Sequence, residues 1–429
     1  MSSIRTMIMS LVKAREVRYY RTLQQVAGQS DEAVRALQLA KLRALVAHFA
    51  EMPYYRAHLA EAGVASTDLR DLADLAQLPP VTKEFLRAHL DAIGASPLAV
   101  QQISTSGSSG VNTVFWGDQR ARIARHAATR FGFSLAGVDA WRDATISIWG
   151  LSPSTSRKQR LLEGAVRFVT NTRLLNGYGL DEARALDYLR QLAAARPRIL
   201  VGYPCYLTLL AQAGLRHGVA PQTPAAVITS GEQLLETQRE VIERYFQTRL
   251  FNRYGSREFS QIAHEDATHG ALYIPPTRFL VETDAHGELL ITDLDNYATP
   301  FIRYRIGDCG AVGDARTHLG RPGQCIIELA GRVHDLLTTP SGRLIPGQFW
   351  TLLSRSVPGI QAFQIVQLDD RRIEMRIIPD ATYDAAQEPH LHAHLHEEFG
   401  DEVALTVQLC TALEETAMGK RKFIMRRTP

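Results

Sequence analysis

The chain has 429 residues, of which 45% are hydrophobic and 22% are charged, a composition that excludes a disordered protein and allows two or more globular domains. Its 48 Lys and Arg residues nearly balance its 45 Asp and Glu residues, leaving a formal charge of +3. Such a balance argues against an obligate nucleic-acid or membrane-surface binder, so small molecules are the expected partners.

The cysteines and the first residues indicate a cytoplasmic protein. The cysteines lie far apart without CxxC spacing, which is typical of reduced free thiols: Cys205, Cys309, Cys325 and Cys410. The first twenty residues contain no uninterrupted apolar core of the kind that a signal peptide needs, because Arg5, Lys13 and Arg15 break it. No apolar run reaches the length of a transmembrane helix.

Helical periodicity marks the N-terminal region. Apolar residues recur at helical spacing from Leu37 to Phe49, Ser30 is placed to cap the helix, and Pro53 breaks it. Further helices are predicted over 181–195 and 235–246.

Short apolar runs alternate with these helices in the middle of the chain. They cover 198–203, 225–231 and 248–255. Strand and helix in alternation predict an α/β domain with a substantially parallel sheet, whose ligands bind beyond the carboxyl ends of the strands.

The pattern changes after Gly270. Extended segments over 271–296 flank a turn at His286–Gly287 and predict an antiparallel portion. Beyond "AGRVHDLL" the chain shows a hairpin over 360–379, a polar helix and a strand over 401–410. This α+β pattern predicts a second, smaller domain.

A loop rich in serine and glycine, "STSGSSGV" (104–111), precedes a strand-like "VNTVFW". Its backbone N–H groups and hydroxyls could converge on a phosphate, although a mobile hairpin tip is the alternative. It is not a Walker A loop, because no GxxxxGK[ST] is present and no helix is expected to follow. The chain also lacks the GxSxG and GxGxxG motifs.

Further motifs follow this loop in a fixed order: "TSGEQL" (229–234), "NRYGSREF" (252–259), "FIRYRIGDCG" (301–310) with "AGRVHDLL" (330–337), and "MGKRKF" (418–423). Together they resemble the core motifs of adenylate-forming enzymes, the superfamily of acyl-CoA ligases and adenylation domains. More narrowly, the chain resembles the phenylacetate-CoA ligase branch with its CapK-like proteins, a likeness that also covers 41–59, 78–87 and 200–211.

The resemblance implies an α/β fold of two parts. A large N-terminal adenylate-forming domain with mixed sheets, residues 1–331, would bind ATP and the acid. A small mobile α+β domain, residues 332–429, would act as a lid, with His334 and Asp335 marking the hinge.

The resemblance also implies nucleotide-binding roles. The β- and γ-phosphates would be held by Ser106, Gly107, Ser108, Ser109 and Gly110. Tyr254 would lie along adenine, with Gly255 and Ser256 as pocket wall. Asp308 would bind the ribose hydroxyls, with a helix or turn cap as the alternative. Gly231 and Glu232 would line the adenine pocket, unless they form an ordinary turn.

The catalytic groups implied by the resemblance carry charge. Glu258 would hold Mg²⁺, with an acidic surface residue as the alternative, and Arg332 would reach ribose or phosphate unless it forms a surface ion pair. Lys420 would bring its charge to the acyl and α-phosphate oxygens when the small domain closes, although Lys422 could serve instead in this basic terminus.

Two departures from the family pattern concern the phosphate loop and zinc. The loop of the family ends Gly-Lys-Pro, whereas Val111 and Asn112 follow Gly110 here, so phosphate affinity is expected to fall. The cysteines of the structural zinc site of the branch are largely missing. His264, His269 and Cys325 do not supply four ligands, and zinc is expected to be absent.

The pairs His390/His394 and His392/His396 are expected on a solvated helix face.

The sequence thus predicts an AMP-forming ligase. It would use Mg²⁺ and ATP to convert a carboxylic acid, aromatic by family resemblance, to an acyl-adenylate, and would transfer the acyl group to the thiol of coenzyme A. A carrier protein or an amine is the alternative acceptor. A nucleotide-binding assembly or regulatory subunit with degenerate catalysis is the alternative of another class. The oligomeric state is not determined by the sequence, and a homodimer is one option.

Overall fold

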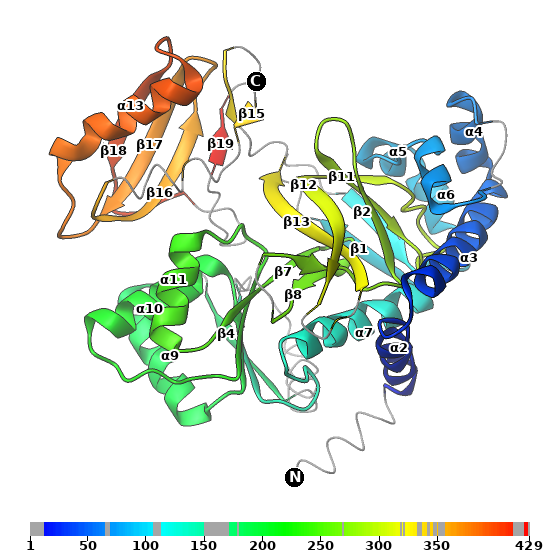
Figure 1. Cartoon of the computed structure of the whole chain (residues 1–429), viewed down its shortest axis with the longest axis horizontal. Helices are drawn as coiled ribbons and strands as arrows, with labels where there is room; N and C mark the ends of the chain where they lie inside the picture. Colours follow the sequence, from blue (N-terminus) through cyan, green and yellow to red (C-terminus); the bar gives the residue numbers. More distant parts are fainter. Residues whose placement is uncertain are drawn as a thin grey trace. The chain divides into compact units, whose positions relative to one another are not determined.

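The computed structural model describes residues 13–64, 69–105, 113–149, 171–177, 180–267, 270–317, 320, 322–332, 337–340, 344–345, 350, 357–414 and 424–427. The chain divides into two compact units (Figure 1). The first unit comprises Met1–Ala144, Gly164–Thr172 and Phe251–Leu329. The second unit comprises Thr145–Glu163, Arg173–Leu250 and Ala330–Pro429. Each unit is considered by itself below.

The helices of the first unit are α2 (Ala14–Val26), α3 (Asp31–Ala50), α4 (Pro53–Glu61), the 3-10 helix Leu72–Gln77, α5 (Lys83–Ala88), α6 (Leu90–Gly94) and α7 (Gln119–Leu135). Ser30 caps α3, because its hydroxyl accepts a hydrogen bond of 3.3 Å from the backbone N–H of Ala33. Pro53 follows the end of α3 and is the first residue of α4. The predicted cap and break are therefore confirmed.

A hairpin and seven neighbouring strands of an 11-stranded sheet complete the first unit. The hairpin pairs β1 (Gln101–Thr105) with β2 (Thr113–Gly117). The seven strands have the order β10-β11-β12-β13-β9-β8-β7. They are β7 (Leu250–Ser256), β8 (Ser260–Glu265), β9 (Leu272–Tyr273), β10 (Phe279–Thr283), β11 (Glu288–Asp293), β12 (Tyr304–Arg316) and β13 (Pro322–Arg332). The antiparallel pairing of β10 with β11 around Gly287, where φ is +81°, confirms the predicted turn.

Aromatic rings form the core beneath this sheet. Phe259 packs edge-on against Phe301 at 4.9 Å between ring centroids, and Phe301 packs against Tyr304 at 5.0 Å. All three side chains are fully buried. On the neighbouring helical layer, α7 packs against both α2 and β8. This close ring packing includes Phe259 of the β7–β8 turn and therefore holds that turn against the core.

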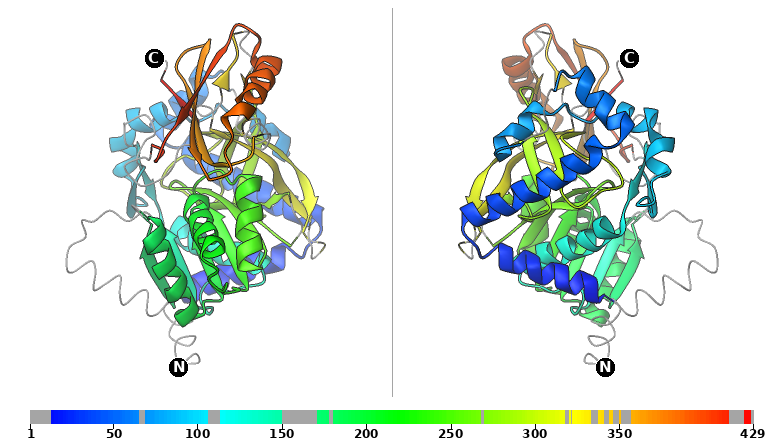
Figure 2. Two further views of the ribbon diagram at one scale, coloured as in Figure 1. Left: turned by 90° about the vertical axis from the view of Figure 1, so that its left-hand side faces the viewer. Right: turned by 90° about the vertical axis from the view of Figure 1, so that its right-hand side faces the viewer.

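The second unit contains the predicted parallel sheet. Its order is β6-β5-β3-β4, formed by β3 (Thr145–Trp149), β4 (Thr172–Asn176), β5 (Ile199–Gly202) and β6 (Ala226–Ser230). Strands β3, β5 and β6 run parallel, as predicted. The helices α9 (Glu182–Ala195), α10 (Pro204–Arg216) and α11 (Glu236–Phe246) lie side by side against this sheet (Figure 2).

The C-terminal part of the second unit is a separate small α+β domain. Its four-stranded sheet has the order β18-β17-β16-β19, with α13 (Glu388–Phe399) lying across one face (Figure 1). The strands are β16 (Ile360–Gln367), β17 (Arg372–Pro379), β18 (Ala404–Leu409) and β19 (Ile424–Arg426), and a two-stranded pair, β14 (Leu337–Thr338) with β15 (Leu344–Ile345), precedes them. The predicted hairpin, helix and strand are confirmed, while the boundary at 331/332 and the mobility of this domain stay predictions.

Within the described parts of the chain, no helix combines the length and the apolar character needed to cross a membrane.

Candidate functional site

A tight turn between β7 and β8 carries the "YGSREFS" motif. A Cβ atom on Gly255 would lie 2.0 Å from the backbone oxygen of Ser260, so no other residue fits there without moving the backbone. Ser260 itself has a φ of +63°, and the β7–β8 register shifts between Tyr254 and Gly255. This bulge turns the residues that follow Tyr254 out of the regular strand.

The two residues expected to hold adenosine lie in contact with each other. Tyr254 on β7 donates its hydroxyl to Asp308 Oδ2 on β12 at 2.6 Å. Gly307, immediately before Asp308, has a φ of +87°, a conformation that favours glycine. Asp308 lies inside β12 and its carboxylate accepts the tyrosine hydroxyl, so it does not cap a helix, and its role at the ribose stays a prediction.

Glu258 is held in the interior of the first unit. Its side chain is 6% exposed, so the alternative of an acidic surface residue is wrong. Tyr304 donates its hydroxyl to Glu258 Oε1 at 3.3 Å. Burial and the Glu258 carboxylate raise the pKa of Tyr304 well above its ordinary value, so this hydroxyl stays protonated. The remaining lone pairs of the carboxylate are oxygen donors of the kind that Mg²⁺ prefers.

Two arginines that the sequence motifs do not include hold the backbone carbonyl groups of Glu258 and Phe259. Arg125 on α7 donates to the carbonyl oxygen of Glu258, and Arg278 donates to that of Phe259 at 2.8 Å. Arg278 is fully buried and pairs with Asp293 at 3.6 Å. Burial, with the nearby Arg278, lowers the pKa of Arg125 to about 10, so the Arg125 guanidinium is still charged at neutral pH. No local sequence signal identifies them, because each acts at a backbone atom far along the chain.

Gly231 and Glu232 lie in the second unit, directly after β6. Gly231 has a φ of +85°, as a turn requires. The Glu232 carboxylate accepts hydrogen bonds from the backbone N–H of Cys205, at 3.2 Å, and from its thiol, at 3.3 Å. Cys205 is the second residue of α10, so Glu232 caps the N-terminus of that helix. The adenine-lining role of both residues stays a prediction.

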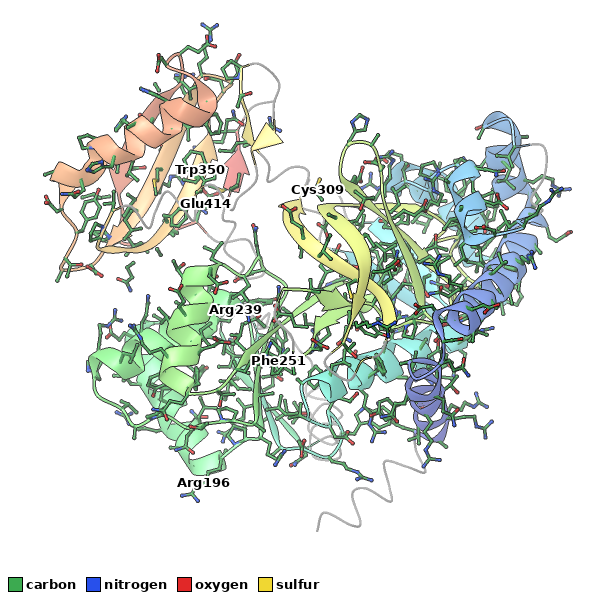
Figure 3. All side chains as sticks on the ribbon, in the orientation of Figure 1. Arg196, Arg239, Phe251, Cys309, Trp350 and Glu414 are labelled. Atoms are coloured by element: carbon green, nitrogen blue, oxygen red, sulfur yellow. The ribbon has the colours of Figure 1, made fainter. Side chains whose placement is uncertain are left out.

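Aromatic residues beside the strands are candidates for contact with the acid, with an ordinary place in the core as the alternative, and they fall into two groups. In the second unit, Trp149 packs edge-on against Tyr203 at 4.8 Å, and Tyr203 lies 5.4 Å from Tyr206. In the first unit, Phe251 on β7 lies 6.3 Å from the ring of His264 (Figure 3). Both groups adjoin strands that carry site motifs, which keeps them as candidates for contact with the acid.

Several predicted site residues lie outside the described part of the chain: Ser106, Gly107, Ser108, Ser109, Gly110, His334, Asp335, Lys420 and Lys422. The same holds for the side chain of Arg332, whose backbone belongs to β13. Thr105 and Thr113 pair across the two strands that flank the phosphate loop. The strand predicted after the loop is therefore confirmed, and the roles of these residues stay predictions.

The possible zinc ligands among the described residues have other contacts. The Nδ1 atom of His264 is 2.6 Å from the backbone oxygen of Glu265, and the thiol of Cys325 is buried. No group of three or more histidine, cysteine, aspartate or glutamate residues suited to a metal occurs where the structure is described, a region that does not include His269. The stretch with the clustered histidines forms α13, as expected.

Comparison with known proteins shows what the chain is similar to. The model of the CapK C-terminal domain matches residues 337–427. Phenylacetate-coenzyme A ligase of Aromatoleum evansii is 24% identical, with 95% of this chain and 97% of that protein covered. Protein CapK of Staphylococcus aureus is 25% identical over 55% of this chain and 54% of that protein. The chain is therefore similar to phenylacetate-CoA ligases and to CapK, and its C-terminal part matches the CapK C-terminal domain.

Solved structures of adenylate-forming ligases share this fold. A 2-hydroxyisobutyryl-CoA ligase in the postadenylation state superposes with a TM-score of 0.71 and 18% identity, covering 92% of this chain and 90% of that one. The amide bond synthetase McbA of Marinactinospora thermotolerans gives a TM-score of 0.52 and 16% identity, with 74% and 67% covered. The fold class expected from the motifs, a mixed α/β ligase with a separate C-terminal domain, is confirmed.

Proposed function

We propose that this ligase activates a carboxylic acid with ATP and Mg²⁺ as an acyl-adenylate and then transfers the acyl group to a thiol, that of coenzyme A. The observation that carries the proposal is the contact between Tyr254 and Asp308, with Glu258 buried on the adjoining turn of the same unit. These residues supply a ribose-binding carboxylate, a ring beside it and a carboxylate for a cation, in the order that the family motifs predict.

Asp308 would bind the ribose of ATP. An ionised carboxylate accepts from both ribose hydroxyls, and the Tyr254 hydroxyl fixes its orientation through the 2.6 Å hydrogen bond. Because β7 and β12 belong to one sheet, this pair is positioned before the nucleotide arrives.

Glu258 supports the chemical step. Bound Mg²⁺ would neutralise the negative charge that develops as the acid attacks the α-phosphate and pyrophosphate leaves. Glu258 would hold the cation, Tyr304 orients the carboxylate, and Arg125 and Arg278 hold the turn on which it lies. Lys420 and Arg332 would add positive charge at the reacting oxygens and at ribose or phosphate.

An acid screen tests the proposal. Purified protein is incubated with ATP, Mg²⁺, labelled pyrophosphate and a panel of aromatic and aliphatic acids, and label returning to ATP is measured. Acid-dependent exchange is the expected result. ATP binding without exchange across the whole panel would contradict the proposal and favour the regulatory alternative, which rests on the missing loop lysine.

The acyl acceptor is tested with the acid that gives exchange. Coenzyme A, a phosphopantetheinylated carrier protein and simple amines are added separately, and the product mass is determined. A thioester of coenzyme A is expected. An acyl-carrier conjugate or an amide as the main product would contradict the choice of acceptor without affecting the adenylation step.

A further inference from the structure

Strand β2, which follows the phosphate loop, has a second neighbour besides β1 in residues 296–299 of the same unit. The Thr299 hydroxyl accepts a hydrogen bond of 3.0 Å from the backbone N–H of Trp116 and donates one of 2.8 Å to the carbonyl oxygen of Trp116. The side-chain amide of Asn296 donates to the same carbonyl oxygen at 3.2 Å. Alternate residues of an antiparallel strand direct these backbone groups away from the paired strand, and here both groups bind the distant segment.

Asp118, directly after β2, adds a further contact with this segment. Its Oδ2 atom accepts the backbone N–H of Tyr297 at 3.0 Å, and its Oδ1 atom accepts that of Ala121 at 2.6 Å, which caps α7. Within the segment, Asn296 Oδ1 accepts the backbone N–H of Thr299 at 3.2 Å and so fixes the turn. Asp118, Asn296 and Thr299 are all buried. We call these three residues the β2 clamp.

The stretch of residues 296–308 begins in the β2 clamp and ends at the proposed nucleotide site. Tyr304 of this stretch donates its hydroxyl to Glu258, and Asp308 accepts the hydroxyl of Tyr254. One continuous segment thus binds the strand next to the phosphate loop with its first residues and carries the ribose-binding candidate as its last. The hydrogen bonds of the β2 clamp therefore set the position of β2 relative to Asp308.

The composition of the phosphate loop makes the position of its flanking strands important. Residues 106–112 include no lysine, arginine or proline, so phosphates would be held by backbone N–H groups and hydroxyls, whose directions follow the backbone. Strands β1 and β2 form a two-stranded sheet, an arrangement that by itself is only marginally stable in water. Thr105 and Thr113 pair at the base of the loop, and Trp116 lies about 10 Å further along β2. Hydrogen bonds at Trp116 therefore fix the strand close to the loop.

We infer that Asn296 and Thr299, together with Asp118, are positioning residues that hold β2, and through it the phosphate loop, in place for the β- and γ-phosphates of ATP. This inference rests on the proposed function, because it names residues that serve the same nucleotide site. The three side chains act through β2 and need no contact with the nucleotide. Their loss should therefore weaken ligands that carry β- and γ-phosphates and spare adenosine, which Tyr254 and Asp308 would hold.

Two substitutions of Thr299 test the inference through ligand affinity. Thr299→Val nearly keeps the shape of the side chain and removes both hydroxyl hydrogen bonds, whereas Thr299→Ser keeps the hydroxyl. Titration calorimetry measures the affinity for ATP with Mg²⁺, and displacement of ATP measures that for adenosine. In Thr299→Val the affinity for ATP should fall about tenfold and that for adenosine by less than about twofold. Thr299→Ser should bind ATP within about twofold of wild type, because the hydroxyl is retained.

Thr292→Val is the matched control for stability. The Thr292 hydroxyl is fully buried in the same unit and accepts the backbone N–H of Arg303 at 2.9 Å, on β11 and not on β2. Both valine variants should lower the melting temperature, but only Thr299→Val should change the ratio of ATP affinity to adenosine affinity. An unchanged ATP affinity in Thr299→Val, equal losses for ATP and adenosine, or the same change of ratio in Thr292→Val would overturn the inference.

Hydrogen exchange in wild-type protein tests the inference without any substitution. Phosphates held by the loop should restrain β2 through the β2 clamp, so ATP with Mg²⁺ should slow exchange of the backbone amides over 113–118 by about threefold or more. Adenosine should leave these amides unchanged. Equal protection by adenosine, or no protection by ATP at a concentration that saturates the protein, would contradict the inference.

Pyrophosphate exchange separates this inference from the proposed function. With an acid that wild type uses, Thr299→Val should raise the KM for pyrophosphate about tenfold and leave the KM for the acid unchanged. Exchange with unchanged KM values for ATP and pyrophosphate in Thr299→Val supports the proposed function and overturns the inference. Selective loss of ATP affinity in Thr299→Val, with no exchange by wild type for any acid, supports the positioning role and contradicts the proposed function.

Discussion

Replacement of Arg278 should destabilise the first unit strongly. The side chain is fully buried, donates to the carbonyl of Phe259 at 2.8 Å, and is the ion-pair partner of Asp293. Asp293 is itself fully buried, and its Oδ2 atom accepts no hydrogen bond from any described residue, so Arg278 supplies the charge compensation for that oxygen. In Arg278→Met the packing volume is largely kept while the charge is lost.

The expected cost follows from these contacts. Removing one partner of a buried ion pair costs about 3 to 5 kcal/mol, because the other charge stays buried without compensation. Loss of the donor to the Phe259 carbonyl belongs to the same network and contributes about 1 kcal/mol within that range. Arg278→Met combined with Asp293→Asn should recover about half of the loss, because the uncompensated charge is then absent.

Urea denaturation of wild type, both single variants and the double variant measures these differences. Hydrogen exchange of the β7 and β8 amides shows whether the loss occurs at the turn that carries Glu258. Arg35→Met is the control, since that side chain is 63% exposed and its ion pair with the 77% exposed Asp314 predicts a loss of at most about 1 kcal/mol. The reasoning is refuted if Arg278→Met costs under about 1 kcal/mol, or if Asp293→Asn gives no recovery.

The loss in Arg278→Met should depend on pH. Burial raises the pKa of Asp293 above its ordinary value while Arg278 opposes that rise, so the variant raises it further. A carboxyl group whose pKa is higher in the folded state than in the unfolded state stabilises the fold as it takes up a proton. The difference between wild type and Arg278→Met should therefore shrink as the pH falls from 8 to 5. A difference that grows would contradict this assignment.

Further predictions concern binding, catalysis and acid stability. Asp308→Asn should raise the KM for ATP by about tenfold, as measured by exchange at saturating acid, while a larger effect on the KM for the acid would argue against ribose binding. Glu258→Gln should shift the Mg²⁺ dependence of exchange to higher concentration, an effect that an unchanged Mg²⁺ titration would rule out. Lys420→Ala should lower the adenylation rate by about 10²- to 10³-fold. Lys422→Ala is the matched comparison, and a larger effect in that variant would assign the catalytic role to Lys422 instead. Burial lowers the pKa of His264 from 6.5 to about 4, so the folded state takes up its proton later than the unfolded state, and stability falls between pH 6.5 and 4. In His264→Gln the free energy of unfolding, measured by urea denaturation, should fall by about 3 kcal/mol less between pH 6.5 and 4 than in wild type. The same fall in both proteins would disprove this prediction.

Local chemistry made much of the secondary structure predictable. Ser30 and Asp181 precede helices and cap them, because a short side-chain oxygen reaches the free backbone N–H groups of the first turn. Pro53 ends one helix and begins the next for an equally local reason. The order of the polar motifs indicated the ligase fold, which the comparisons support.

Pairing between distant segments could not be predicted in this way. The strand over 404–409 was expected, but its parallel alignment with β17 depends on the chain path through α13 and not on its own residues. Likewise, the adenine-lining role of Glu232 stays a prediction, but the contact of its carboxylate with Cys205 at the start of α10 could not be predicted, because only the fold brings these residues together.

The sequence by itself determined which segments are helices, strands and turns, and which residues are candidates for binding ATP, because secondary structure and motifs depend on neighbours a few positions away. The tertiary structure alone decided that Tyr254 contacts Asp308 and that Arg278 holds the turn of Glu258. Hydrogen bonds, burial and charge compensation are set by distances in space, and sequence spacing does not contain those distances.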